Sequence, residues 1–119
     1  MSLMTSILAS LVALEHLFIM YLETFATHSE QTSKAFGMTV EELRRSSVTT
    51  LFKNLGIYNG LIAIGLIYGI VTGNLEITTL FVLSVIAAAS YGAATSNVMI
   101  ILKQGGPAIL ALLSILFFH

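Results

Sequence analysis

Three ionisable side chains, Glu15, His16 and Glu23, interrupt the first long apolar stretch of this sequence. A charged group at membrane depth costs roughly 2.5–3.5 kcal/mol on insertion scales, so such groups usually face a bundle interior and often serve a function. A carboxylate can exchange a proton for a cation, and an imidazole with a carboxylate can act as general acid and base. We take these three residues as candidate acid/base or proton-coupling groups.

Helical spacing limits how these groups can interact. His16 and Glu23 are seven residues apart, so on a helix they share a face with roughly 10 Å between them, and Met20 lies between them. They cannot bond each other directly, so each needs a partner on another helix. The spacing does not match the i, i+3 or i, i+4 pairs of helical metal sites, so we predict no metal ion and no cofactor.

Composition places these groups in a membrane. The sequence is 56% hydrophobic and 9% charged, which lies outside the range of soluble globular proteins, so the lipid bilayer is the first expected partner. Five basic residues and a net charge of -1 cannot neutralise a nucleic-acid backbone, so nucleic acid is excluded as a partner. The absence of cysteine excludes disulfides and thiolate metal sites.

Four segments approach the length of about 20 apolar residues that one helical span needs, at about 3–26, 53–71, 77–95 and 98–118. They predict an all-α, integral membrane four-helix bundle with up-down topology, as a single transmembrane domain over residues 1–119. Pro107 should either kink the fourth span or start its helix there. A helix that starts at Pro107 is too short to span, so we favour a kinked fourth span.

The connections carry further signals. Thr39 and Glu42 form a capping-box pattern, which predicts a short interfacial helix between the first and second spans. A tight turn is expected at Thr72-Gly73-Asn74-Leu75-Glu76, and another at Ser96-Asn97. The positive-inside rule predicts a protein of the cytoplasmic membrane with both termini outside the cytoplasm, because one side holds every basic residue: Lys34, Arg44, Arg45, Lys53 and Lys103.

Small residues predict how the helices pack. Gly56 and Gly60 lie on one face of the second span, whereas Gly65, Gly69 and Gly73 lie about 180° away, so the two sets should contact different neighbours. The stretch 87–94 is almost all small and should also pack closely. These surfaces allow a homo-oligomer, in which Glu15 can face a partner subunit. We interpret Thr24, Ser84 and Ser114 as hydrogen-bonded to their own helices.

The remaining intramembrane polar residues share one depth. In the predicted topology they all fall in the cytoplasmic half, which predicts a polar pocket open to the cytoplasm. Its lining would complement Glu15, His16 and Glu23 with Met20, Asn54, Tyr58, Asn59, Tyr91, Thr95 and Gln104. The alternative is that Asn54 and Asn59 only join helices and that the tyrosines only pack.

Four motifs together resemble a known family. They are Ala13-Leu14-Glu15-His16-Leu17, Tyr58-Asn59-Gly60 with Asn54 upstream, Tyr91-Gly92-Ala93-Ala94-Thr95 and Gln104-Gly105-Gly106-Pro107-Ala108. In this order they look like a bacterial family of small four-span membrane proteins known only as a domain of unknown function. The resemblance implies four spans and no established activity. One departure is Leu55, where the family pattern leads us to expect glutamine.

Three functions fit these residues. The first is binding or transport of a small hydrophobic or amphipathic molecule, since a carboxylate in the first of four spans is similar to the arrangement in small multidrug transporters. The second is an isomerase- or hydrolase-like membrane enzyme for a lipid-soluble substrate, with His16 and Glu23 as acid and base. The third is a structural or partner-binding subunit, in which the polar residues only hold helices together.

Overall fold

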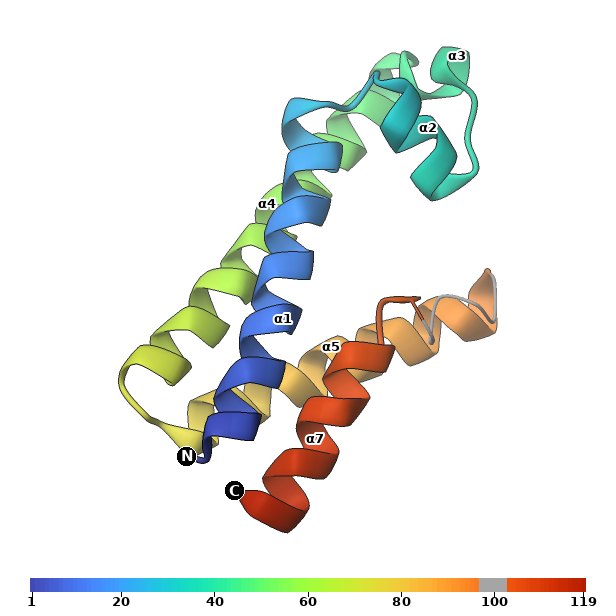
Figure 1. The fold of residues 1–119 in the computed structure, drawn as a ribbon. Helices are drawn as coiled ribbons and strands as arrows, with labels where there is room; N and C mark the ends of the chain where they lie inside the picture. Colours follow the sequence, from blue (N-terminus) through green and yellow to red (C-terminus); the bar gives the residue numbers. More distant parts are fainter. Residues whose placement is uncertain (97–102) are drawn as a thin grey trace. The chain divides into compact units, whose positions relative to one another are not determined.

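All secondary structure in the described part of the chain is helical, as the long apolar segments predict (Figure 1). The structure, a computed structural model, describes residues 1–96 and 103–119. Three helical segments in this part are long and apolar enough to cross a membrane: Leu3–Phe25, Ser46–Val71 and Leu75–Thr95. The chain divides into two compact units, His16–Ile62 and the pair of segments Met1–Glu15 with Ala63–His119.

The unit His16–Ile62 joins two helices through a folded connection. It contains the end of α1 (Leu3–Met20), the π-helical turn η1 (Tyr21–Phe25), α2 (Glu30–Phe36), α3 (Val40–Leu43) and the start of α4 (Ser46–Val71). Figure 1 shows the chain leaving η1, passing through α2 and α3, and returning as α4. Helix α2 packs against both η1 and α3.

Local capping explains the two short helices. Ser29 accepts a hydrogen bond from the Thr32 amide at 3.1 Å and so caps the start of α2, and Gly37, with a φ of 64°, follows the last residue of this helix. Thr39 accepts from the Glu42 amide at 3.1 Å, and Glu42 accepts from the Thr39 amide at 3.0 Å, so the predicted capping box is confirmed. These bonds from Thr39 hold the pKa of Glu42 below its usual value.

The second unit contains α5 (Leu75–Thr95) and α7 (Gly106–Phe118), which pack against each other (Figure 1). The turn predicted before α5 is confirmed: Gly73 has a φ of 63°, and Asn74 accepts from the Ile77 amide at 3.0 Å. Ser84 bonds to its own helix as expected, at 2.8 Å from the Leu80 carbonyl.

Ser114 corrects a prediction. Its hydroxyl lies 2.6 Å from the hydroxyl of Thr5, so it joins the start of α1 to α7 instead of bonding only within its own helix. Thr5 is fully buried and Ser114 is 3% exposed, so each hydroxyl needs a partner, and they supply one to each other.

The glycine set at the end of α4 approaches α5 closely. A Cβ at Gly69 would lie 2.5 Å from the Thr78 hydroxyl, and one at Gly65 would overlap the ring of Phe81. In the small-residue stretch of α5, Ala89 is buried, whereas Ala87, Ala88, Ser90 and Ala94 are exposed. Close packing of that whole stretch therefore stays a prediction.

Two helix boundaries differ from the sequence prediction. Helix α4 begins at Ser46, well before the expected span start at Lys53, because polar residues extend the helix beyond its apolar part. Helix α7 begins at Gly106 with Pro107 in its first turn, so the chain starts a helix there instead of kinking one. Proline suits a first turn because it lacks an amide, and Gly105-Gly106 disfavours a continuous helix.

Helix α7 has 13 residues, or about 20 Å, against a hydrocarbon core of about 30 Å. Residues 98–102 of the predicted fourth span, and Asn97 of the predicted turn, lie outside the described residues. The four-span bundle, its up-down topology and its organisation as one domain therefore stay predictions.

Candidate functional site

Glu23 is the predicted site residue whose surroundings are best defined. It lies in η1 with an exposed fraction of 4%, and its Oε1 accepts a hydrogen bond of 2.6 Å from Nδ2 of Asn59 on α4. The seven-residue spacing from His16 required a partner on another helix, and Asn59 was one of the expected partners. Because an amide is neutral, this bond alone does not compensate the charge of an ionised carboxylate.

The π-helical turn determines where Glu23 points. Its defining bond runs from the Ala26 amide to the Tyr21 carbonyl at 2.9 Å, five residues back. A π turn holds one residue more than an α turn, so every later side chain is rotated relative to a regular helix. Such turns are rare and are frequent at functional sites.

Side-chain hydroxyls fix the end of this turn. Thr27 donates to the Glu23 carbonyl at 2.6 Å, and the fully buried Thr32 donates to the carbonyls of Leu22 and Ala26 at 3.1 and 2.7 Å. Carbonyls at a helix end otherwise lack partners. The backbone that carries Glu23 is therefore held by the protein itself.

Lys53 and Thr24 form a second connection between η1 and α4. Lys53 Nζ donates to the Thr24 carbonyl, and Thr24 Oγ1 donates to the Lys53 carbonyl, each at 2.9 Å. The prediction that Thr24 bonds to its own helix was therefore wrong. Sequence reasoning also missed the role of Lys53 and used only its charge. The sequence could have indicated this role, because Lys53 is predicted to lie opposite the C-terminal end of the first span, and cations are favourable at helix C-termini.

Two glycines let α4 approach this region. A Cβ at Gly60 would lie 2.5 Å from the Met20 sulfur, and one at Gly56 would overlap the Thr24 hydroxyl. Gly65 and Gly69 approach α5 instead, so the prediction of different neighbours is confirmed for these four glycines. Gly73, the third member of the second predicted set, lies in the turn after α4, and a Cβ there would have nothing within 4 Å. The close approach brings Asn59, on the same helix as these glycines, within hydrogen-bond distance of Glu23.

Glu15 and His16, adjacent in the sequence, have different surroundings. His16 is 1% exposed. Glu15 is half-buried, and its Oε1 is buried without a hydrogen-bond partner in the described residues. A buried carboxylate oxygen without a partner is unusual in a folded protein, so Glu15 keeps its place among the candidate groups.

The other predicted lining residues are mostly exposed. Met20 is half-buried against Gly60, and Asn54 is exposed. Tyr58 and Tyr91 are 68% and 74% exposed. Thr95 is exposed and donates to the carbonyl of Tyr91 at 2.9 Å, and Gln104 is half-buried.

Within one unit the structure brings together Glu23, Asn59 and Met20 with the glycine face of α4. Glu15, Tyr91, Thr95 and Gln104 belong to the other unit. Their participation in one pocket with Glu23 stays a prediction.

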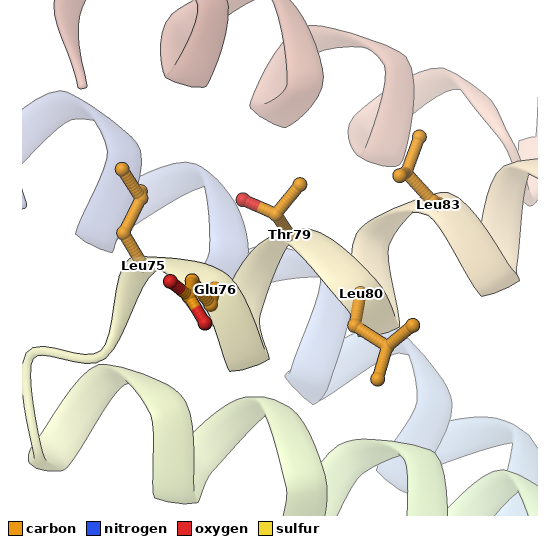
Figure 2. Close-up of a pocket in the computed structure, with 5 residues that line it drawn as sticks. All are labelled: Leu75, Glu76, Thr79, Leu80 and Leu83. Atoms are coloured by element: carbon orange, nitrogen blue, oxygen red, sulfur yellow. The ribbon is translucent and has the colours of Figure 1, made fainter.

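A shallow hollow lies beside the start of α5, and none of the predicted site residues line it. Its lining consists of Leu75, Glu76, Thr79, Leu80 and Leu83. Figure 2 shows that all five side chains come from this one helix. Because no second element supplies groups to it, this hollow has no convergent binding chemistry. Within the described residues, no three His, Asp or Glu side chains lie close enough together to hold a metal ion.

Comparison with known proteins agrees with the motif resemblance. The family described as "Protein of unknown function (DUF1304)" matches residues 10–116. A protein of Lactococcus lactis subsp. lactis (strain IL1403), described as "Uncharacterized protein YpaA", is 60% identical over 119 residues, which cover 98% of this chain and 100% of the relative. No solved structure gives a significant match. The similarity includes the whole region from Glu15 to Asn59.

Proposed function

The chain belongs to the DUF1304 family of proteins of unknown function, and we propose that it is a multi-pass protein of the cytoplasmic membrane that binds or transports a small amphipathic cation at Glu23. Three membrane-length apolar helices support the location. The proposed topology has four spans with both termini outside the cytoplasm, because all five basic residues fall on one side of these spans and four of the five lie within residues 34–53.

The observation that carries this proposal is the buried carboxylate of Glu23, held by the neutral amide of Asn59 at 2.6 Å. An ionised carboxylate in a membrane is costly unless it is paired with an opposite charge. Lys53, the nearby cation, donates instead to a backbone carbonyl. The carboxyl of Glu23 is therefore suited to hold either a proton or a cationic ligand, but not both.

Alternation between these two states would couple ligand to proton. When the ligand binds, the proton leaves the Glu23 carboxyl for solvent and the ligand charge replaces it. When the ligand leaves, a proton returns. The thioether of Met20 beside Gly60 offers an adaptable apolar contact for the rest of an amphipathic molecule.

Proton release on binding tests this function. The purified protein in detergent, in weak buffer, would be titrated with tetraphenylphosphonium, a lipophilic cation, while a pH dye reports released protons. We expect about one proton released per bound cation in the wild type. Glu23→Gln should abolish the release and weaken binding by about tenfold or more, because the amide cannot be charged.

Matched variants make the result specific. Glu76→Gln removes an exposed carboxylate in the first turn of α5 and should leave both binding and release unchanged. Glu15→Gln shows whether the second carboxylate shares the proton. Glu23→Gln keeps an oxygen that can accept from Asn59, so circular dichroism should show a folded protein. Unchanged proton release in that folded variant, or no binding by the wild type, would refute the proposal.

A further inference from the structure

The connection between η1 and the apolar part of α4, residues 27–53, folds into what we call the interfacial platform. The rings of Phe36 on α2 and Phe52 on α4 meet edge to face at 5.1 Å. His28 Nε2 and Thr49 Oγ1 share a hydrogen bond of 3.0 Å, and Thr49 Oγ1 also donates to the Leu43 carbonyl at 2.7 Å. These contacts attach both short helices to the start of α4, so the platform presents its surface residues in fixed positions.

Basic side chains concentrate on this platform. Four of the five Lys and Arg residues of the sequence lie in it, and all four are exposed: Lys34, Arg44, Arg45 and Lys53. Arg44 and Arg45 lie side by side in sequence between α3 and α4, next to the fully buried Leu43. Their amides donate to the carbonyls of Val40 and Glu42 at 3.0 and 3.1 Å, which anchors the backbone of the arginine pair.

The acidic residues of the platform have local roles. The carboxylate of Glu42 accepts from both the amide and the hydroxyl of Thr39, at 3.0 and 3.1 Å. Glu30 lies in the first turn of α2, where a negative charge favours the helix dipole. Glu41 lies in the first turn of α3, so all three platform carboxylates lie at helix starts. The platform keeps a small positive excess, whereas the rest of the chain is negative.

Helix geometry places the arginine pair near lipid headgroups. Helix α4 begins at Ser46, and its apolar part begins near Lys53, about 10 Å further along the axis. The headgroup layer extends roughly 5–8 Å beyond the hydrocarbon on each side. A tilted helix and the length of an arginine side chain cover the remaining distance. Exposed Leu51 lies between the arginines and Lys53, as expected for a segment that meets the bilayer surface.

We propose that the interfacial platform binds the phosphate headgroups of anionic phospholipids through Arg44 and Arg45. Guanidinium groups bind phosphate oxygens in a bidentate manner, and because the backbone that carries both arginines is already anchored, the backbone loses little freedom on binding. Lys34 adds to the local positive potential. This proposal rests on the membrane location proposed above but not on the chemistry of Glu23, so either can fail without the other.

Lipid affinity measures this interaction directly. The wild-type protein would be placed in nanodiscs of phosphatidylcholine, or solubilised in a neutral detergent, and titrated with fluorescent phosphatidylglycerol. We expect saturable binding of phosphatidylglycerol over phosphatidylcholine. The double variant Arg44→Gln/Arg45→Gln should weaken this binding by about 10- to 30-fold, since each basic residue near an anionic surface contributes an effect of roughly fivefold. Arg44→Lys/Arg45→Lys should lose less, because it keeps the charge.

Lys103→Gln is the matched control, because it removes an exposed lysine outside the platform and should lower the affinity much less than the arginine variant does. Added salt should weaken wild-type binding, since exposed charges are screened. The lipid-selectivity and salt measurements use only the wild-type protein, so they do not depend on whether a variant folds. Equal binding of both lipids by the wild type, an effect of Lys103→Gln equal to that of the arginine variant, or displacement of the lipid by inorganic phosphate would each overturn the assignment.

Discussion

The two halves of α4 use the same packing device for different contacts. Gly56 and Gly60 let it approach η1 and the end of α1, and Gly65 and Gly69 let it approach α5. In both places glycine has no side chain that would hold the two elements apart, so they can approach closely. We call these the first and second glycine contacts. The spacing of four residues is identical, so the difference between them lies in the residues that meet the glycines.

The first glycine contact depends on polar groups that reach across to another element. Glu23 bonds to Asn59, and Lys53 and Thr24 bond to each other's backbone carbonyls. In the second contact the Phe81 ring supplies apolar packing, and Thr78 donates its hydroxyl to the Asn74 carbonyl in its own helix start.

A charge change can therefore act on the first contact but not on the second. Only in the first contact does an ionisable side chain, Glu23, bond across to another element, so only there does protonation or cation binding change the charge at a bond between elements. This difference explains why we place the proposed cation exchange at Glu23.

Removing a buried hydrogen bond from each contact should give the largest difference between the two contacts in the free energy of unfolding. Asn59→Leu leaves the Glu23 carboxylate without its amide, and we expect it to lower the free energy of unfolding by about 2 kcal/mol. Thr78→Val keeps the shape and removes only a bond within one helix segment, so it should cost less than about 1 kcal/mol. Unfolding in mixed detergent micelles, followed by circular dichroism, compares the two.

Glu23→Gln is the control for this measurement, because an amide oxygen can still accept from Asn59. It should unfold close to the wild type. Equal losses for Asn59→Leu and Thr78→Val would show that the first contact is not specifically polar.

The glycines themselves should differ by a smaller amount. In Gly56→Ala the new Cβ would overlap the Thr24 hydroxyl and lie 3.0 Å from the Thr24 backbone nitrogen, which cannot rotate away. We expect a loss of about 1–2 kcal/mol, within the range for overpacking. Gly65→Ala meets only the Phe81 ring, a side chain that can turn, so its loss should be near the lower end of that range.

Gly106→Ala is the matched control, since nothing lies within 4 Å of a Cβ there. The same unfolding measurement should show no loss, because alanine favours a helix over glycine. If Gly65→Ala costs more than Gly56→Ala, then the second contact is the more tightly constrained one.

Local patterns predicted much of this arrangement. Counting 100° per residue separated the two glycine sets, and the Thr39–Glu42 pattern predicted the start of α3. The need of Glu23 for a partner on another helix also followed from spacing alone, and Asn59 supplies it. These inferences succeed because each depends on regular helix geometry or on one capping interaction.

The remaining features depend on departures from regular geometry. The π turn at Tyr21–Phe25 adds a residue, so a helical wheel misplaces Thr24, which we assigned to its own helix. The polar start of α4 at Ser46 has no apolar periodicity to reveal it. Exposed Tyr58 shows a further limit, because residue type and depth do not specify which face of a helix is covered.

The smallest expected change in the free energy of unfolding comes from the exposed polar bond of the first contact, and it shows how far burial, and not polarity alone, determines the strength of that contact. Lys53 is exposed, unlike Glu23, although its ammonium also bonds across to η1. Water competes for such a bond, so Lys53→Met should lower the free energy of unfolding by only about 0.5–1 kcal/mol. Thr24→Val removes the reciprocal bond, and a double-mutant cycle gives the coupling between the two. Lys103→Met, which removes an exposed lysine elsewhere, should be neutral. If Lys53→Met lost as much stability as Asn59→Leu, the exposed bond of Lys53, and not the buried carboxylate of Glu23, would hold α4 against η1. The difference between the two glycine contacts would then arise at the end of the π turn and not at Glu23.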